Sequence, residues 1–240
     1  MITVSPILYA AAPSPWHALA EAVGLAPAFP PDAAWSEFVA DGGLAVHGVA
    51  PEDPLSGTTD LHFLVDDLAA AEASLVAAGF TAEHTPLDDV GDMLSVVIGS
   101  GARVTLTQPS SPPPAPTGPL AVLPIWYQPD LAEPQRLLEA LGLRARLSAD
   151  AGVWMDFVAD GGGLVGLHRD EHVSFELSFE YSADLDALAE RLTTAGYAAA
   201  VVDEAYNRTL RVATPDRSDL FVNGRQDDLY GYTRHDGAPA

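Results

Sequence analysis

The sequence of 240 residues contains no cysteine and no lysine, and all 11 basic residues are arginines, the first of them Arg103. Without cysteine, disulfide bonds, thiolate metal ligands and a thiol nucleophile are excluded. The net charge of −23 repels nucleic acid and anionic membranes, so we expect neither as a partner. No apolar run reaches the roughly 18–20 residues that span a bilayer, and residues 2–12 lack the positive charge of a secretory signal. We therefore expect a cytoplasmic protein.

What the sequence does contain is an internal repeat. Residues 60–65 alternate as a strand does and run into a helical pattern that ends at residue 79. The same order returns at 176–197. Segments 35–43 and 154–162 both begin with Trp and both end in Phe-Val-Ala-Asp-Gly-Gly. The sequence therefore predicts four modules, each with a strand, a helix and further strands, in two similar halves.

This arrangement resembles the vicinal oxygen chelate superfamily, which includes glyoxalase I, extradiol dioxygenases and bleomycin-resistance proteins. The resemblance covers almost the whole chain. It rests on the four modules, the strand-to-helix junction Val65-Asp-Asp-Leu68, the Ala-Gly-aromatic sequence after the helices, and the strand Leu44-Ala-Val-His47. It implies an α+β fold in which four βαβββ modules form two tandem glyoxalase-like domains, a fused pseudo-dimer with one cavity in each half.

The resemblance also suggests domain boundaries. We predict a first glyoxalase-like domain at 1–108, a Pro-rich linker at 109–119, a second domain at 120–224 and a polar C-terminal tail at 225–240. The prolines of the linker favour an extended, semi-rigid spacer. We expect a monomer or a homodimer.

Metal-dependent members of the superfamily take ligands from the first and last strands of each module. The matching positions are Ser5, Ala45, Asp60 and Thr105 in the first half and Leu123, Gly166, Glu176 and Phe221 in the second. Only the two carboxylates are ordinary metal ligands, so we expect no metal cofactor. The alternative is a divalent metal at a displaced site made of His47, Asp60 and His62, which has the composition of a two-His-one-carboxylate triad.

Aromatic, acidic and imidazole side chains remain for the cavities. The candidate ligand-binding residues are Tyr9, Trp35, Glu37, His47, Asp60 and His62 in the first half and Tyr127, Trp154, Asp156, His168, Glu176 and Glu180 in the second. The sequence does not decide whether the two tryptophans face a cavity or pack in a core. No pattern marks catalytic residues: there is no nucleophile elbow, and the glycine-rich runs join two strands as hairpin turns.

We expect from these residues a metal-free small-molecule-binding protein of the glyoxalase/bleomycin-resistance type, which holds an aromatic or cationic compound by stacking and charge. The alternative is a metal-dependent lyase, isomerase or dioxygenase that uses the displaced site. A third hypothesis is a regulatory module without small-molecule chemistry. Glu176 and Glu180 lie on one face of a predicted strand, so they are the expected anchors for a cationic aromatic ligand in the second-half cavity.

Overall fold

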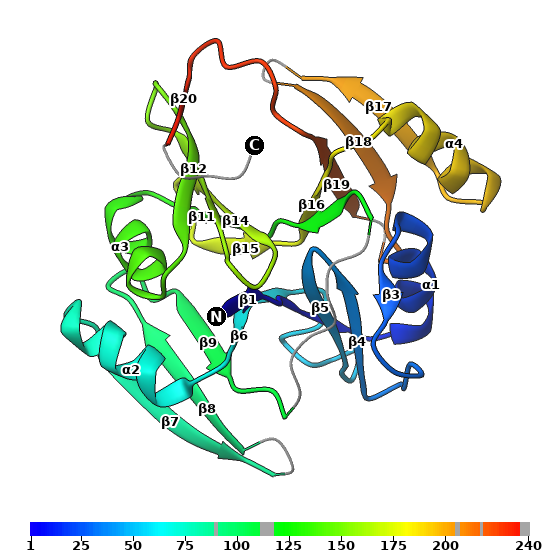
Figure 1. Cartoon of the computed structure of the whole chain (residues 1–240). Coiled ribbons are helices and arrows are strands. Elements are labelled where there is room, and N and C mark those ends of the chain that lie inside the picture. Colours follow the sequence, from blue (N-terminus) through cyan, green and yellow to red (C-terminus); the bar gives the residue numbers. More distant parts are fainter. Residues whose placement is uncertain (89–90, 111–117, 205–206, 217, 236–240) are drawn as a thin grey trace.

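The structure, a computed structural model, describes residues 1–88, 91–110, 118–204, 207–216 and 218–235. Within these residues the chain forms four successive βαβββ modules, which confirms the predicted α+β fold class (Figure 1). Most of the linker expected at 109–119 and the last residues of the tail expected at 225–240 lie outside the described residues. The domain boundaries therefore stay a prediction.

The first half contains modules 1 and 2. Module 1 consists of β1 (Ile2–Val4), β2 (Ile7–Ala10), α1 (Pro13–Val23), β3 (Ala26–Pro27), β4 (Trp35–Ala40) and β5 (Gly42–Gly48). Module 2 consists of β6 (Thr59–Val65), α2 (Leu68–Ala77), β7 (Ala82–Leu87), β8 (Gly91–Val97) and β9 (Arg103–Thr107).

The second half repeats this order. Module 3 consists of β10 (Leu120–Val122), β11 (Ile125–Gln128), α3 (Ala132–Ala140), β12 (Arg144–Ala149), β13 (Trp154–Val158) and β14 (Leu164–Arg169). Module 4 consists of β15 (Ser174–Glu176), β16 (Ser178–Tyr181), α4 (Leu185–Thr194), β17 (Ala199–Asp203), β18 (Arg208–Ala213) and β19 (Asp219–Gly224), and β20 (Tyr232–Arg234) follows it.

Local sequence explains where the helices begin and end. The carboxylate of Asp67 accepts a hydrogen bond from the backbone N–H of Ala70 at 2.9 Å, which caps α2 as the acidic pair in the sequence predicts. Asp184 caps α4 in the same way. Helix α1 ends at Gly24, whose φ of 119° lies in the left-handed region that glycine adopts readily.

The strand that directly precedes the helix of each module runs parallel to the last strand of the same module. In the first half, β2 pairs with β6 and joins both modules into one nine-stranded sheet. In the second half, β11 pairs with β15 in a six-stranded sheet, and β16 belongs to a neighbouring five-stranded sheet. The first strands of consecutive modules therefore meet at a seam in each half.

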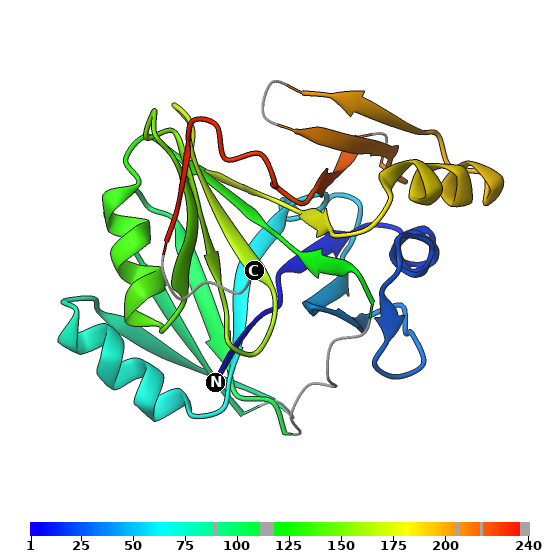
Figure 2. The ribbon, with the colours of Figure 1, turned by 45° about the horizontal axis from the view of Figure 1, so that its top comes forward.

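Two hydrophobic cores lie between the helices and the sheets, and each core combines both halves of the chain. One contains Leu75 of α2 and Leu137 of α3, and the other contains Leu19 of α1 and Leu188 of α4, all at most 1% exposed. Figure 1 accordingly shows α2 beside α3 and α1 beside α4, and Figure 2 shows the strands between the two helix pairs. Packing of modules 1 with 4 and 2 with 3 therefore joins the halves.

Candidate functional site

A tyrosine and a carboxylate meet at the seam of each half. In the first half, Ile7 pairs with Asp60, and the Tyr9 hydroxyl donates a hydrogen bond to Asp60 Oδ2 at 3.1 Å. In the second half, Ile125 pairs with Glu176, and Tyr127 lies close enough to the Glu176 carboxylate to lower its pKa through hydrogen bonding. The two pairs occupy the same place in the repeat.

Each of these tyrosines lies beside a histidine, and each histidine lies beside a tryptophan. The ring centroid of His168 is 5.3 Å from that of Tyr127 and 6.1 Å from that of Trp154. His47 lies in the same way, 5.4 Å from Tyr9 and 5.5 Å from Trp35. The strand register explains this Trp-His-Tyr arrangement. In each half the histidine strand lies between the other two strands, so the histidine is the cross-strand partner of the tryptophan on one side and of the tyrosine on the other. Both tryptophans therefore share a sheet face with the histidine and the tyrosine.

Tyr127, His168 and Trp154 of the second half line a cavity of about 260 Å³. Glu176 is not part of this lining; it lies at a neighbouring hollow with Phe175 and Leu177. The walls of the 260 Å³ cavity come from β11, β12, β13, β14, β16 and β19, with Tyr232 of β20 and residues before it at one side. Such a volume is slightly below the usual 300–1,000 Å³ of small-molecule sites. The aromatic and charged side chains of the lining include Tyr127, Arg146, Trp154, Asp156, His168 and Glu180. Trp154, Tyr127 and His168 give the cavity an aromatic wall.

A buried charge cluster forms the polar side of this cavity. Arg146 bonds Asp156 through Nε and Nη2 at 3.0 and 2.8 Å, and it bonds Glu180 through Nη1 and Nη2, both at 2.7 Å. Burial lowers the pKa of Arg146, but its bonds to both carboxylates outweigh this effect and raise the pKa, so the guanidinium stays charged. Glu180, which the sequence pattern suggested as an anchor for a cationic ligand, is thus paired with Arg146.

Sequence reasoning missed Arg146 and the tail strand. The alternation of β12 gives no sign that Arg146 turns inward, because its neighbour Leu147 also lines the cavity. The sequence predicts only that the tail is polar, but β20 of the tail pairs with β12, and Tyr232 lines the cavity. The one available signal for the tail was its pair of tyrosines, Tyr230 and Tyr232, in a polar segment.

Burial also shifts the pKa values of the seam residues. Burial, followed by the nearby Asp60 carboxylate, raises the pKa of Tyr9 to about 12. Burial raises the pKa of Glu176, and the hydrogen bond from Tyr127 opposes this shift. Glu176 is therefore a stronger base than an ordinary glutamate. Nδ1 of His168 is buried without a hydrogen-bond partner among the described residues, a rare condition for a polar atom.

The first half differs in its polar contacts. His62 is 6% exposed, and its two ring nitrogens form hydrogen bonds with the hydroxyls of Thr105 and Thr107 at 2.8 and 3.0 Å. Burial lowers its pKa to about 4. Glu37 accepts a hydrogen bond from the indole N–H of Trp35, which is 37% exposed. Arg103 also reaches Asp60, at 3.4 Å.

The metal positions of the superfamily do not fit a metal ion. Glu176 is the only ordinary ligand among the four second-half positions. Gly166 has no side chain to act as a ligand, and the Trp154 ring packs against it so closely that an added Cβ would overlap the ring. The displaced site also lacks free donors, because both nitrogens of His62 and the carboxylate of Asp60 are engaged. In the part of the chain that the structure describes, no three His, Asp or Glu side chains are placed to hold a metal.

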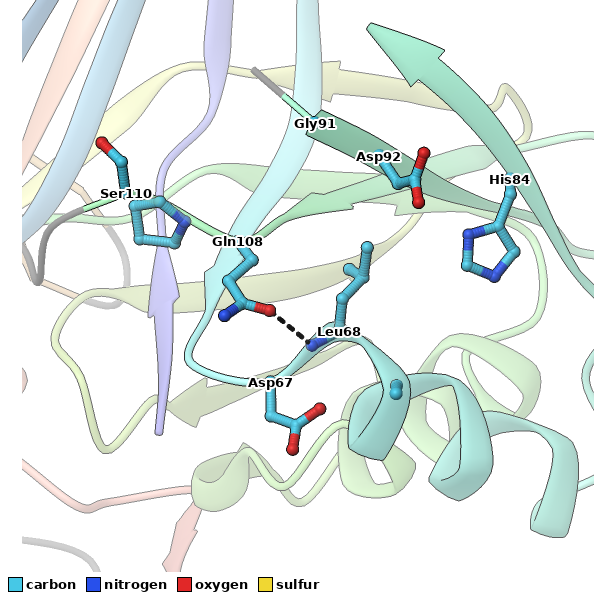
Figure 3. A pocket seen from close by; sticks show the side chains of 9 residues that line it. Asp67, Leu68, His84, Gly91, Asp92, Gln108 and Ser110 are labelled. Carbon is cyan, nitrogen blue, oxygen red and sulfur yellow. Dashed lines mark hydrogen bonds between the residues drawn. The ribbon is translucent and has the colours of Figure 1, made fainter. Parts of the chain in front are cut away.

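Another hollow lies away from these residues, at the start of α2 (Figure 3). It has a volume of about 540 Å³ and is lined in part by Asp67, His84, Asp92 and Gln108. Gln108 Oε1 accepts a hydrogen bond from the backbone N–H of Leu68, and Asp67 is the helix cap described above. Because these polar groups satisfy the helix start, the hollow is a weaker candidate than the aromatic cavity. None of the helices in the described residues is long and apolar enough to cross a membrane.

The fold is that of the vicinal oxygen chelate superfamily, and its similar solved structures are extradiol dioxygenases. A catechol 2,3-dioxygenase has a TM-score of 0.62 and 14% identity, over 98% of this chain and 95% of that one. The 2,3-dioxygenase LapB from Pseudomonas sp. KL28 has a TM-score of 0.61 and 16% identity, over 95% and 92%. Homoprotocatechuate 2,3-dioxygenase from Brevibacterium fuscum, in complex with 3,4-dihydroxyphenylacetate, has a TM-score of 0.62 and 13% identity, over 99% and 82%.

By contrast, no protein-family model and no curated protein sequence matches the chain. The structural neighbours confirm the resemblance that the modules predicted, at the level of the fold. They contradict the expected role as a metal-free binding protein, because they are metal-dependent enzymes. The expectation was wrong because missing metal ligands argue only against metal-dependent catalysis. They say nothing about the other groups of the cavity that can transfer protons.

Proposed function

We propose that the protein is an enzyme that binds a small aromatic substrate in the second-half cavity and transfers a proton at it, in an isomerase- or lyase-type reaction. One observation carries the proposal: a tyrosine beside a carboxylate, with a neighbouring histidine and tryptophan, occurs in both halves, and Tyr127, His168 and Trp154 of the second half line an aromatic cavity. Glu176 lies outside the lining and acts through Tyr127. The dioxygenase fold supports an enzymatic role, and the catechol and dihydroxyphenylacetate named for its neighbours are small aromatic compounds.

Each residue of the set has a distinct role in this proposal. Trp154 stacks on the substrate ring. Glu176 is the general base, and its raised pKa makes it a better proton acceptor near neutral pH. The Tyr127 hydroxyl links it to the substrate: Tyr127 gives its proton to Glu176 while it takes one from the substrate. One substrate–hydrogen bond breaks, and one O–H bond forms on Glu176. His168 lines the cavity beside Trp154 and packs against the substrate ring.

Metal-dependent oxygenation is the second candidate, and the names of the structural neighbours favour it. The donor sets of this chain do not fit a metal, so no step of the mechanism above passes through one. Metal content and oxygen uptake separate the two candidates. One tightly bound iron or manganese per chain, together with oxygen uptake in the presence of catechol, would support the dioxygenase.

Hydrogen exchange at phenylacetone tests the proton transfer without knowledge of the natural substrate. The protons between its ring and its carbonyl are acidic, and their replacement by deuterium in heavy water is followed by NMR. We expect exchange faster than in buffer, and a loss of at least about 100-fold in Glu176→Gln and in Tyr127→Phe. The rate should rise with pH as Glu176 loses its proton, with a midpoint above the usual 4.5 for glutamate.

The first half supplies the matched control. Tyr9→Phe removes the equivalent hydroxyl of the other seam and should leave the exchange rate unchanged. Exchange no faster than in buffer, or an undiminished rate in Glu176→Gln, would contradict the proposal.

A further inference from the structure

Arg146 enters the cavity because of an irregularity in β12. The pairing of β12 with β13 joins Ala145 to Phe157 and Leu147 to Asp156, so Arg146 is an extra residue without a partner of its own. Such a β-bulge changes the direction of a side chain, and bulges are frequent beside active sites. The bulge therefore lets Arg146 and Leu147 line the same cavity although they are adjacent in the chain.

The side chain of Arg146 forms hydrogen bonds with residues of two different sheets. Asp156 belongs to β13 of the six-stranded sheet, and Glu180 belongs to β16 of the five-stranded sheet. The side chains of Arg146, Asp156 and Glu180 are 11%, 3% and 11% exposed. Buried ion pairs are often no more stabilising than apolar packing, so stability alone gives a weak reason for three buried charges at a cavity wall.

The cluster has more hydrogen-bond acceptor sites than donor groups. A guanidinium has five N–H groups, and four of those of Arg146 bond the two carboxylates. The carboxylates have about eight lone-pair sites, of which four accept from Arg146 and one accepts from the backbone N–H of Leu147, so about three sites remain. With one positive and two negative groups, the cluster also carries a net negative charge.

Among the described residues of the first half no equivalent cluster occurs, although the seam is alike. Glu37 occupies the position of Asp156, but Leu64 occupies the position of Glu180, and Ala28 faces Glu37 where β12 supplies its arginine. The cluster therefore distinguishes the half that contains the proposed reaction site from its repeat.

We propose that the Arg146–Asp156–Glu180 cluster determines the substrate class: an aromatic compound with a hydrogen-bond-donating group, a protonated amine above all, bound through the free acceptor sites of the two carboxylates. This inference rests on the proposed function, since it concerns the same cavity. An aromatic carboxylate is disfavoured, because it would place a further negative charge beside the two carboxylates of the cluster. A neutral alcohol binds with intermediate affinity.

Three probes that share one ring test the inference: benzylamine, benzyl alcohol and benzoate. Titration calorimetry gives the affinities, and the ring signals of His168 in NMR spectra report binding at this cavity. We expect benzylamine to bind about tenfold more tightly than benzyl alcohol, because hydrogen bonds between charged groups are roughly twice as strong as neutral ones. Benzoate should bind at least about tenfold more weakly than the alcohol, since like charges repel in a buried site.

The variant Glu180→Gln keeps the size of the side chain and removes one negative charge. It should weaken benzylamine binding by about tenfold and change benzyl alcohol binding by less than about twofold. Glu37→Gln, at the first-half position equivalent to Asp156, is the matched control and should change neither. The ranking of the three probes by the unmodified protein decides the question even where the variant does not fold.

The outcomes separate the two proposals. Equal affinities for the three probes, with shifts of the His168 signals, would overturn the substrate class and leave the proposed reaction site intact. A preference for benzoate would do the same. If no probe perturbs His168, the cavity does not bind small aromatic compounds, and both proposals fail.

Discussion

Acid should destabilise the protein through His62, and the structure gives the size of the effect. Burial lowers the pKa of this imidazole from 6.5 to about 4. Its two nitrogens are already bonded to threonine hydroxyls, so the neutral ring is the form that the fold accommodates. The unfolded chain takes up a proton below pH 6.5, whereas the folded chain does so only near pH 4. Stability that is present above pH 6.5 is therefore lost as the pH falls through this window.

Each pKa unit corresponds to about 1.4 kcal/mol, so the shift amounts to about 3 kcal/mol of unfolding free energy. Carboxylates titrate in the same range, so the wild type alone does not isolate this contribution. His62→Gln keeps a donor and an acceptor between Thr105 and Thr107 but has no titrating group. We expect the stability advantage of the wild type over this variant to shrink by about 3 kcal/mol as the pH falls from above 6.5 to about 4.

Urea unfolding followed by circular dichroism measures this difference at each pH, and an NMR titration of the His62 ring measures the pKa directly. Ser178→Ala is the control from the second half, where Ser178 occupies the position of His62 and donates a hydrogen bond to the carbonyl of Leu123 at 2.8 Å. Its cost should not depend on pH. Parallel stability curves for the wild type and His62→Gln, or a ring that titrates at 6.5, would refute the reasoning.

Three further outcomes follow from the structure. The wild type should lose roughly 2–3 kcal/mol of unfolding free energy between pH 10 and about 12, because the raised pKa of Tyr9 stabilises the fold only while the phenol is protonated. Tyr9→Phe should not show this loss, and unfolding at alkaline pH measures the difference. Gly166→Ala should cost about 1–3 kcal/mol, since its Cβ overlaps the Trp154 ring; Ala45, the first-half counterpart, already carries a Cβ, and thermal unfolding measures the difference. Residues 1–109 alone should not unfold cooperatively, because each core needs both halves, and a cooperative transition of that fragment would contradict this.

The sequence was sufficient to predict the modules, because each one is a local pattern. Alternation marks the strand, an aspartate caps the helix, and a glycine ends it, all within about 20 residues. These signals survive at 11–16% identity to the structural neighbours, where no family model detects the chain. The pairing of α1 with α4 and of α2 with α3 was not predictable in this way, because helix periodicity identifies an apolar face and does not identify its partner.

Part of the candidate site was equally accessible from the sequence. The repeat offsets pointed to Trp154, His168 and Tyr127 as counterparts of Trp35, His47 and Tyr9, and the structure places both sets in the same order across their sheets. Arg146 was not accessible, because a bulge breaks the alternation on which face assignments depend. The pairing of Glu180 with that arginine was hidden for the same reason.

The comparison of the two halves indicates how one scaffold changes its chemistry. The seam is kept: both halves hold a tyrosine against a carboxylate, beside a histidine and a tryptophan. The next positions along the strand differ, with His62 and Leu64 in one half and Ser178 and Glu180 in the other. His62 fills its site with an imidazole bonded to two threonines. The smaller Ser178 accepts a hydrogen bond from Asn223, and Glu180 bonds the bulged arginine. Because strand residues two apart point to the same face, the two differences on this strand change one wall of the site, and the bulged arginine of β12 supplies the positive charge that Glu180 pairs with.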